Sequence, residues 1–259
     1  MELKLYQVDA FASHVFSGNP AAICPLQHWL ADDTMQAIAM ENNLSETAFF
    51  VPTDDGYHIR WFTPLAEVDL CGHATLACAH VIFNLLGYSG ERIIFQSKSG
   101  PLGVTRQHDW LELDFPAQPA SACKTPAALQ QAFGDRLQAC LKAEDYIVVL
   151  DDESAVVNAA PDLALLRQLD LRGVAITAKA TDCDFVCRFF APKYGIDEDP
   201  VTGSAYTQLV PYWAQQLGRN EFSARQLSRR GGELNCTLSG DRVKIAGQAV
   251  LFMEASIHI

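Results

Sequence analysis

The chain is poor in positive charge. It has 259 residues with 19 Lys and Arg against 31 Asp and Glu, a formal net charge of −12. The most basic local feature is the single pair Arg229-Arg230. Because a nucleic-acid surface must neutralise a row of phosphates and an anionic membrane repels negative charge, the composition argues against both as partners.

Long apolar runs are also missing. The longest stretch, Leu76 to Leu86, is interrupted by His80 and Asn84 and falls short of the roughly 20 residues that a bilayer requires. The first residues have neither the basic segment nor the apolar segment of a secretory signal. We therefore expect a cytoplasmic protein without a membrane span. A hydrophobic fraction of 49% with 19% charged residues is a globular composition.

Several chemistry-bearing motifs do not occur. The sequence has no Cys-x-x-Cys, no glycine-rich nucleotide loop and no Gly-x-Ser-x-Gly, which leaves nucleotide and serine-hydrolase chemistry without support. In a reducing compartment the eight cysteines are expected as free thiols. Cys71-x-His73 and Cys78-x-His80 would lie about 10 Å apart along a helix, with i and i+2 side chains on different faces, so we expect no metal and no cofactor.

Two glycine-bounded helices divide the pattern of predicted strands. One is expected over 74–86 with Gly87 as its stop, the other over 203–217 with Gly218 as its stop. Gly72 and Gly87 are 15 residues apart, as are Gly203 and Gly218. A Pro-rich linker at 117–128 lies between them, and another helix is expected over 127–141. A strand is expected over 44–51, stopped by Pro52. We predict an α+β chain of two similar domains, residues 1–116 plus 250–259 and residues 117–249, with the ligand at their seam.

Glu46 is the sharpest catalytic candidate. Period-two alternation places it on the face of Leu44, Ala48 and Phe50. A carboxylate among apolar side chains loses hydration, which disfavours its charged form and suits it to exchange protons near neutral pH. The alternative is that Phe49 and Val51 mark the inward face and Glu46 is solvated.

Two helix starts are candidate binding sites. Asp199 precedes Gly203 and Ser204 at one of them, where exposed backbone N–H groups could hold a carboxylate or phosphate; the alternative is a well-capped surface helix. Cys71 and His73 occupy the other, where a helix N-terminus would lower the pKa of the thiol and His73 could bind a ligand. The alternative there is an inert buried cysteine and a structural histidine.

Five separate segments, in order along the chain, resemble the phenazine biosynthesis PhzF family. They are Asp9–Phe11 with Phe16–Ala21, Asn43–Phe49, Arg60–Pro64, Glu67–Thr75 and Asp199–Ala205. The resemblance implies the diaminopimelate epimerase-like fold, two similar domains that each wrap a β-barrel-like sheet around a central helix, with the active site in the cleft between them. It also implies a cofactor-independent isomerase of small amino or hydroxy acids, commonly a cytoplasmic homodimer.

The same resemblance assigns roles to individual residues. Glu46 moves the proton, and His73 and Asp199 orient the substrate. The carboxylate site is lined by Gly72, Gly203 and Ser204, and Asn19 of the first segment also binds the substrate.

Related epimerases and racemases use two facing cysteines. Cys71 matches the first position, but Asp199, Pro200 or Thr202 occupies the second, depending on register. Cys71 is therefore a secondary candidate, and a cysteine-dependent epimerase or a non-catalytic binding protein remain the alternatives.

Overall fold

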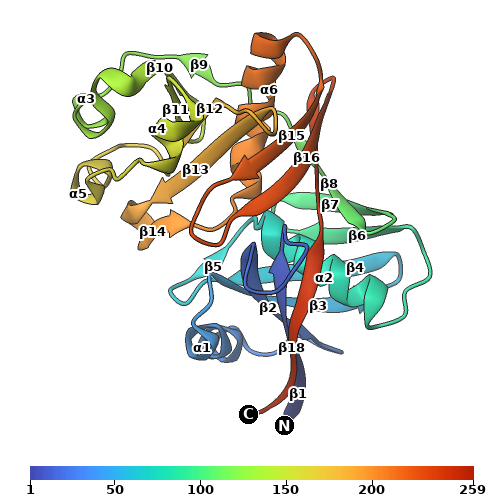
Figure 1. Cartoon of the computed structure of the whole chain (residues 1–259). Coiled ribbons are helices and arrows are strands. Elements are labelled where there is room, and N and C mark those ends of the chain that lie inside the picture. The colour runs from blue at the N-terminus through green and yellow to red at the C-terminus, as the bar shows by residue number, and fades with distance from the viewer. The chain divides into compact units, whose positions relative to one another are not determined.

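The computed structural model describes all residues, 1–259, and divides into two compact units (Figure 1). Unit 1 comprises Met1–Asp114 and Ala246–Ile259, and unit 2 comprises Phe115–Ile245. The boundaries expected from the sequence, after residues 116 and 249, lie two and four residues beyond the observed ones, after residues 114 and 245.

The elements of unit 1 include two helices, α1 and α2. In chain order they are β1 (Glu2–Ala10), β2 (Asn19–Pro25), α1 (Asp32–Asn42), β3 (Glu46–Thr53), β4 (Gly56–Phe62), β5 (Glu67–Val68), α2 (Gly72–Asn84), β6 (Arg92–Ser97), β7 (Gly100–Gln107), β8 (Trp110–Pro116) and β18 (Ala249–His258). The last strand returns from the end of the chain to pair antiparallel with β1.

Unit 2 carries α3 to α6 and two 3-10 turns. Its elements are β9 (Ser121–Ala122), α3 (Ala127–Phe133), η1 (Gly134–Arg136), β10 (Leu137–Lys142), β11 (Tyr146–Leu150), α4 (Glu153–Val157), α5 (Leu163–Leu166), β12 (Val174–Lys179), β13 (Phe185–Ala191), η2 (Pro192–Tyr194), β14 (Ile196–Asp199), α6 (Gly203–Leu217), β15 (Glu221–Gln226), β16 (Gly232–Ser239) and β17 (Arg242–Gly247).

The two units repeat one strand pattern. In unit 1 the pairs β1/β2, β2/β3, β3/β4, β4/β6 and β6/β7 are alternately antiparallel and parallel. In unit 2 the pairs β10/β11, β11/β12, β12/β13, β13/β15 and β15/β16 follow the same alternation. The long helix follows a short strand in each, α2 after β5 and α6 after β14. The glycine spacing therefore marked a real duplication of architecture.

Apolar side chains surround α2 almost completely. All of its residues from Gly72 to Phe83 are buried except His80, as the nearly continuous apolar sequence predicts. It lies against β1, β2 and β3, while α1 covers the opposite face of these strands with Met35 and Ile38 in a separate cluster. None of the helices combines the length and apolar character needed to cross a bilayer.

Several expected element boundaries are wrong. A helix over 127–141 is replaced by α3, which ends before Gly134 at φ +57°, because the following residues pair as β10 with β11. The helix predicted over 74–86 begins earlier, at Gly72, and ends at Asn84. The strand expected to stop at Pro52 continues to Thr53 because Pro52 still lies opposite Tyr57 in the β3/β4 hairpin.

Candidate active site

Glu46 is the first residue of β3 and lies on the face of the sheet that α2 covers. Its neighbour Ala48 on the same face is opposite Trp61 of β4, whereas Phe49 packs in the cluster under α1. Both faces are therefore buried, and Glu46 is on the α2 side with 12% of its side chain exposed. Leu44, expected to share that face, instead packs against the α1 cluster because it precedes the strand.

His73, the second residue of α2, meets Glu46 directly. Its Nε2 lies 3.1 Å from the Oε2 of Glu46, with only 7% of the histidine side chain exposed. Both atoms are fully buried and neither makes a hydrogen bond of acceptable geometry. Because buried polar atoms in proteins are nearly always hydrogen-bonded, this pair has the character of a site that is completed by a ligand.

The other ring nitrogen of His73 has two neighbours. The Nδ1 atom lies 3.3 Å from Nδ2 of Asn19 and 3.5 Å from Sγ of Cys71. The expectation that Cys71 and His73 point to different faces is wrong, because Cys71 is the extended N-cap residue at φ −146° rather than part of the helix. Four of the predicted residues, Asn19, Glu46, Cys71 and His73, thus lie together in unit 1, and Gly72 begins α2 between two of them.

Burial and these contacts set the protonation of the cluster. Desolvation and the nearby Glu46 raise the pKa of the Cys71 thiol, so the lowered pKa considered for a cysteine at a helix start is wrong. The pKa of His73 lies well above its ordinary value: burial alone would lower it, but Cys71 and Glu46 raise it by more. At neutral pH the raised pKa of Cys71 favours a neutral thiol. Because a neutral thiol carries no charge, the contact with Glu46 is then what favours the protonated imidazole of His73.

Glu46, Cys71 and His73 could also be considered as metal ligands, since one donor atom of each lies within 4.8 Å of the others. However, Glu46 approaches Nε2 and Cys71 approaches Nδ1, so no single ring nitrogen faces both. Metal ligands must also be deprotonated, and the pKa of each of Cys71 and His73 is raised. The arrangement is therefore a poor fit for one shared ion.

The predicted residues of unit 2 lie at the start of α6. Thr202 donates to Oδ2 of Asp199 at 2.5 Å, and Gln226 donates to the Thr202 hydroxyl at 3.2 Å. Gly203 is the first residue of the helix, and Thr202 precedes it without capping it through its side chain. These contacts form a one-way chain of donors that ends on the Asp199 carboxylate.

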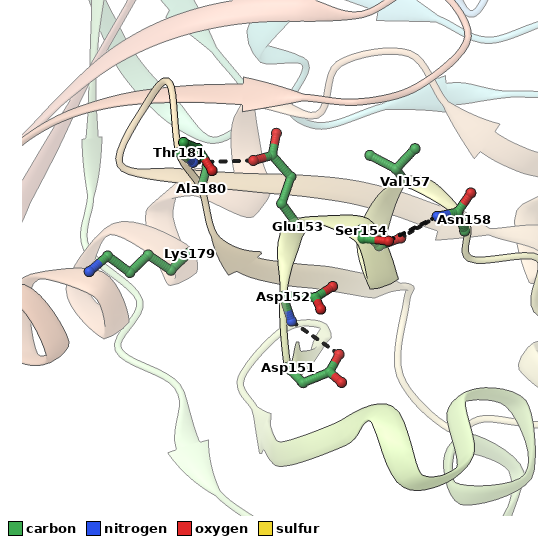
Figure 2. A pocket seen from close by; sticks show the side chains of 9 residues that line it. All are labelled: Asp151, Asp152, Glu153, Ser154, Val157, Asn158, Lys179, Ala180 and Thr181. Atoms are coloured by element: carbon green, nitrogen blue, oxygen red, sulfur yellow. Dashed lines mark hydrogen bonds between the residues drawn. The ribbon is translucent and has the colours of Figure 1, made fainter.

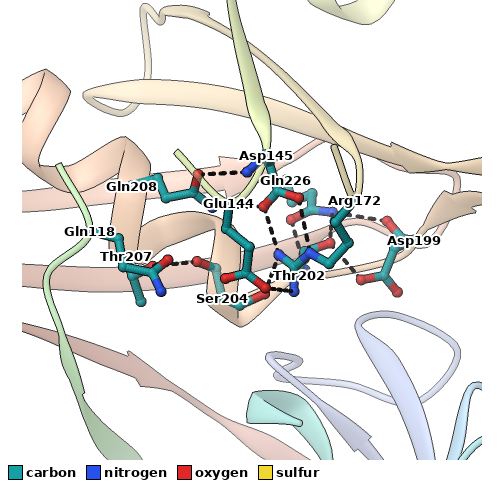
Figure 3. A network of polar contacts seen from close by, with 10 residues as sticks. All are labelled: Gln118, Glu144, Asp145, Arg172, Asp199, Thr202, Ser204, Thr207, Gln208 and Gln226. Carbon is teal, nitrogen blue, oxygen red and sulfur yellow. Dashed lines mark hydrogen bonds and ion pairs between the residues drawn. The ribbon is translucent and has the colours of Figure 1, made fainter. Parts of the chain in front are cut away.

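A charged network that the sequence did not reveal supports Ser204 (Figure 3). Arg172 donates to both carboxylate oxygens of the fully buried Asp145, at 2.9 and 2.6 Å. The same guanidinium donates to Oγ of Ser204 at 3.0 Å, and Gln208 donates to Asp145 at 2.7 Å. Since arginine only donates, the Ser204 oxygen is the acceptor, and its hydrogen is left for another partner.

The duplicated strand order was the signal that could have found Arg172. It lies two residues before β12, and β12 has the place in unit 2 that β3, with Glu46 at its start, has in unit 1. Ser204 likewise follows the first residue of α6 as His73 follows the first residue of α2.

A surface pocket of about 670 Å³ lies elsewhere in unit 2, around the start of α4 (Figure 2). Asp151 and Asp152 on its wall pair with Arg136, and Glu153 accepts from the Thr181 backbone at 3.2 Å. None of the predicted site residues lines it, and its carboxylates already have protein partners. It has no feature that indicates chemistry.

Comparison with known proteins identifies the family and the fold. Residues 8–255 match the family model described as phenazine biosynthesis-like protein. An uncharacterized isomerase of Pseudomonas aeruginosa is 52% identical over the whole of both chains. A crystal structure of a PhzF-family phenazine biosynthesis protein from Enterococcus faecalis superposes with a TM-score of 0.98 at 45% identity, covering all of both chains.

The fold extends to more distant enzymes. A hydroxyproline epimerase from Agrobacterium vitis shares it with a TM-score of 0.66 at 10% identity, over 99% of this chain and 92% of that one. The expected diaminopimelate epimerase-like α+β fold is thereby confirmed, and so is the isomerase class. The chain belongs to the phenazine biosynthesis-like PhzC-PhzF family and is an isomerase-class enzyme.

Proposed function

We propose that the protein is a cofactor-independent isomerase that moves a proton between carbons of a small amino or hydroxy carboxylic acid, with Glu46 as the general acid and base. The observation that carries this proposal is the buried contact of Glu46 Oε2 with His73 Nε2 at 3.1 Å, in which neither atom has a hydrogen bond. A base and an adjacent cation kept away from water are the elements that carbon-acid chemistry needs.

The reaction requires one proton to leave a carbon and one to return. Glu46 takes the proton from the carbon next to the carboxylate or enamine, and the electron pair left behind shifts along the conjugated system. The protonated Glu46 then delivers its proton to the other end of that system. His73, whose pKa is raised, lies 3.1 Å from the Glu46 oxygen and orients that side chain for the transfer.

Residues of unit 2 would supply substrate binding in this scheme. Asp199, oriented by Thr202, would accept from an amino or hydroxyl group of the substrate. The hydroxyl of Ser204, whose oxygen already accepts from Arg172, would donate to the carboxylate. Backbone N–H groups at Gly72 and Gly203 begin two long helices, where the positive end of the helix dipole favours an anion.

Solvent deuterium exchange tests the proposal across a panel of candidate substrates. Purified protein is incubated in D2O with small amino, imino, hydroxy and unsaturated acids, and deuterium on carbon is detected by NMR. We expect incorporation into at least one acid by the wild type and its loss in Glu46→Gln. Glu254→Gln is the matched control, since Glu254 is half exposed and pairs only with Lys4. Absence of Glu46-dependent exchange throughout the set would refute the proposal.

The two alternatives make different predictions. A cysteine-dependent epimerase requires a thiolate at Cys71, which the raised pKa and the burial of that thiol oppose; full activity of Cys71→Ala would eliminate it. A non-catalytic binding protein predicts unchanged ligand affinity in Glu46→Gln and no turnover, so any Glu46-dependent turnover would eliminate it.

The family resemblance extends the proposal to assembly and location. We expect a homodimer that works without a cofactor in the cytoplasm. Light scattering after size-exclusion chromatography measures the oligomeric state. Activity that survives extensive dialysis against a chelator would support independence from a cofactor or metal.

A further inference from the structure

A buried tryptophan lies on the same face of the sheet as Glu46. Trp61 of β4 is directly opposite Ala48 of β3, and Ala48 is two residues from Glu46. Opposed residues of an antiparallel pair share a face, and so do residues two apart in a strand. Trp61 and Glu46 are therefore diagonal neighbours, which places their Cα atoms about 7–8 Å apart, within reach of an aromatic side chain.

The other members of the cluster share this face and this end of the strands. Asn19 begins β2 two residues from Ala21, which pairs with Glu46. The short strand β5 pairs with Trp61 and Phe62 and leads directly into α2, which carries His73 as its second residue. Trp61 thus lies beneath the start of α2, at the end of the sheet where His73 meets Glu46.

The indole of Trp61 lacks a hydrogen-bond partner. The residue is 1% exposed, and its Nε1 is a fully buried donor with no acceptor. Buried tryptophan N–H groups usually have a partner, as Trp213 does through its 3.0 Å bond to Thr177. An unmade bond of this kind destabilises the free protein, so its persistence calls for an explanation.

The indole N–H of Trp61 is therefore a fully buried donor without an acceptor, on the face where Glu46 Oε2 and His73 Nε2 form an ion pair at 3.1 Å. A free donor beside this pair matches a ligand that offers an acceptor oxygen next to an acidic C–H group. A carboxylic acid with a hydrogen on its α-carbon, or the vinylogous equivalent, has this combination.

We propose that Trp61 is a substrate-binding residue whose indole N–H donates to a carboxylate oxygen of the substrate, next to the carbon that Glu46 deprotonates. This inference rests on the proposed isomerase function and deepens it, because it adds a specific donor and restricts the substrate to acids small enough to enter a buried site. A donor aimed at the carboxylate also stabilises the negative charge that builds up there as the α-proton leaves.

The test uses the indole N–H signals of the 15N-labelled full chain, which contains four tryptophans. Trp61→Phe assigns the Trp61 signal, and Trp213→Phe assigns that of a buried tryptophan whose N–H is already bonded. Acetate, glycolate, glycine and benzoate are each titrated to saturation or to 100 mM. We expect at least one of them to move the Trp61 signal downfield with a saturable dependence and to leave the Trp213 signal in place.

Affinity and kinetics then separate a binding role from a packing role. Trp61→Phe should weaken binding of that carboxylate, and lower kcat/KM for any acid found by deuterium exchange, by about 10- to 100-fold, the effect of losing a hydrogen bond to a charged group. Trp213→Phe removes the same ring area and should lower Tm without changing affinity. Circular dichroism of Trp61→Phe verifies that the fold is retained.

Two results would overturn the inference: no probe moves the Trp61 signal, or Trp61→Phe binds the probe as tightly as the wild type. The second would assign the unpartnered N–H to an ordered water or to packing. These outcomes are distinct from failure of the isomerase proposal, which is judged by Glu46-dependent exchange. If Glu46-dependent deuterium exchange occurs but the Trp61 N–H signal does not move, only the role of Trp61 is refuted.

Discussion

The charged network at the start of α6 allows a quantitative prediction about unit 2. Asp145 is fully buried, and its carboxylate accepts two hydrogen bonds from Arg172 and one from Gln208. In Arg172→Gln the guanidinium is lost and the carboxylate stays buried with Gln208 as its remaining side-chain donor. Removing one partner of a buried ion pair typically costs about 3–5 kcal/mol. Because 31% of the Arg172 side chain is exposed, solvent screens part of this, and we expect about 3 kcal/mol.

A double-mutant cycle separates the pair from the rest of the network. Asp145→Asn removes the charge but keeps an oxygen that can accept, so it should cost less than Arg172→Gln. The double variant Arg172→Gln with Asp145→Asn has no uncompensated charge. Its loss of stability should therefore be smaller than the sum of the single losses by at least about 1 kcal/mol.

Urea denaturation followed by circular dichroism measures these free energies of unfolding. Native-state hydrogen exchange with mass spectrometry shows where the loss arises, and the amides of α6 should respond before those of α2. Additive losses in the cycle, or a cost of Arg172→Gln below about 1 kcal/mol, would refute the assignment of a buried ion pair that stabilises unit 2. A rise in KM with little change in kcat would further agree with Arg172 supporting the Ser204 hydroxyl.

Four further predictions concern charge and thiols. Hydrogen bonds from Arg60 lower the pKa of Glu67 to about 2 despite partial desolvation. Glu67 therefore stabilises the fold at pH values above its unfolded pKa of 4.5, and this stability is lost as the pH falls. After allowance for solvent screening, Glu67→Gln should lower the free energy of unfolding, measured by urea denaturation, by about 1–2 kcal/mol at pH 7 and by much less at pH 3. The pKa of His73 is raised, so its contribution is complete below pH 6.5 and decreases as the pH rises through the folded pKa; the stability gap between wild type and His73→Asn should narrow from pH 6 to pH 9. Cys71→Ala should keep most of the exchange activity, and iodoacetamide should label Cys71 slowly in the native protein. Diamide should join Cys123 and Cys140, whose sulfur atoms lie 3.5 Å apart, with a mass loss of about 2 Da in the wild type and none in Cys140→Ser; labelling of both thiols after diamide would contradict this.

The sulfur pair has a simple geometric basis. Ala122 lies opposite Leu141 in the antiparallel β9/β10 pair, and the N–H of Cys123 donates to the carbonyl of Cys140 at 3.0 Å. Directly opposed, hydrogen-bonded residues have Cα atoms about 5.5 Å apart, inside the range that disulfides span. Burial and the neighbouring Cys123 raise the pKa of Cys140 to about 12, so the more exposed Cys123 should react first with the oxidant.

The sequence was a good guide where local pattern and burial agree. The apolar character of α2 and the stop at Gly218 follow from residues that have few other conformations, and α6 begins and ends where it was expected. The helix predicted through 127–141 failed because Leu137–Lys142 gains more from pairing with β11 than from helix propensity. Such non-local pairing is invisible to a window of neighbouring residues.

The site was predictable in its members but not in its contacts. Glu46 and His73 stand in family-like segments, yet nothing in their spacing shows that Nε2 and Oε2 meet at 3.1 Å. The prediction for Cys71 is wrong for a specific reason: helical periodicity does not describe an N-cap residue with extended backbone. Arg172 was missed because it belongs to no recognised segment and acts through the register of β12 and the start of α6.

The repeated architecture connects these separate observations. Each unit has a charged side chain at or just before an equivalent strand, Glu46 at the start of β3 and Arg172 before β12. In each unit that side chain contacts the second residue of the long helix, His73 in α2 and Ser204 in α6. One copy presents a carboxylate that can accept a proton, and the other presents a hydroxyl whose oxygen is held by a guanidinium. A duplicated scaffold that had kept the same residue in both places would favour a symmetric two-base racemase. Under the proposed isomerase function, the carboxylate of one copy would serve as the base and the hydroxyl of the other as a binding group. The Glu46→Gln and Arg172→Gln variants should then separate into effects on kcat and on KM.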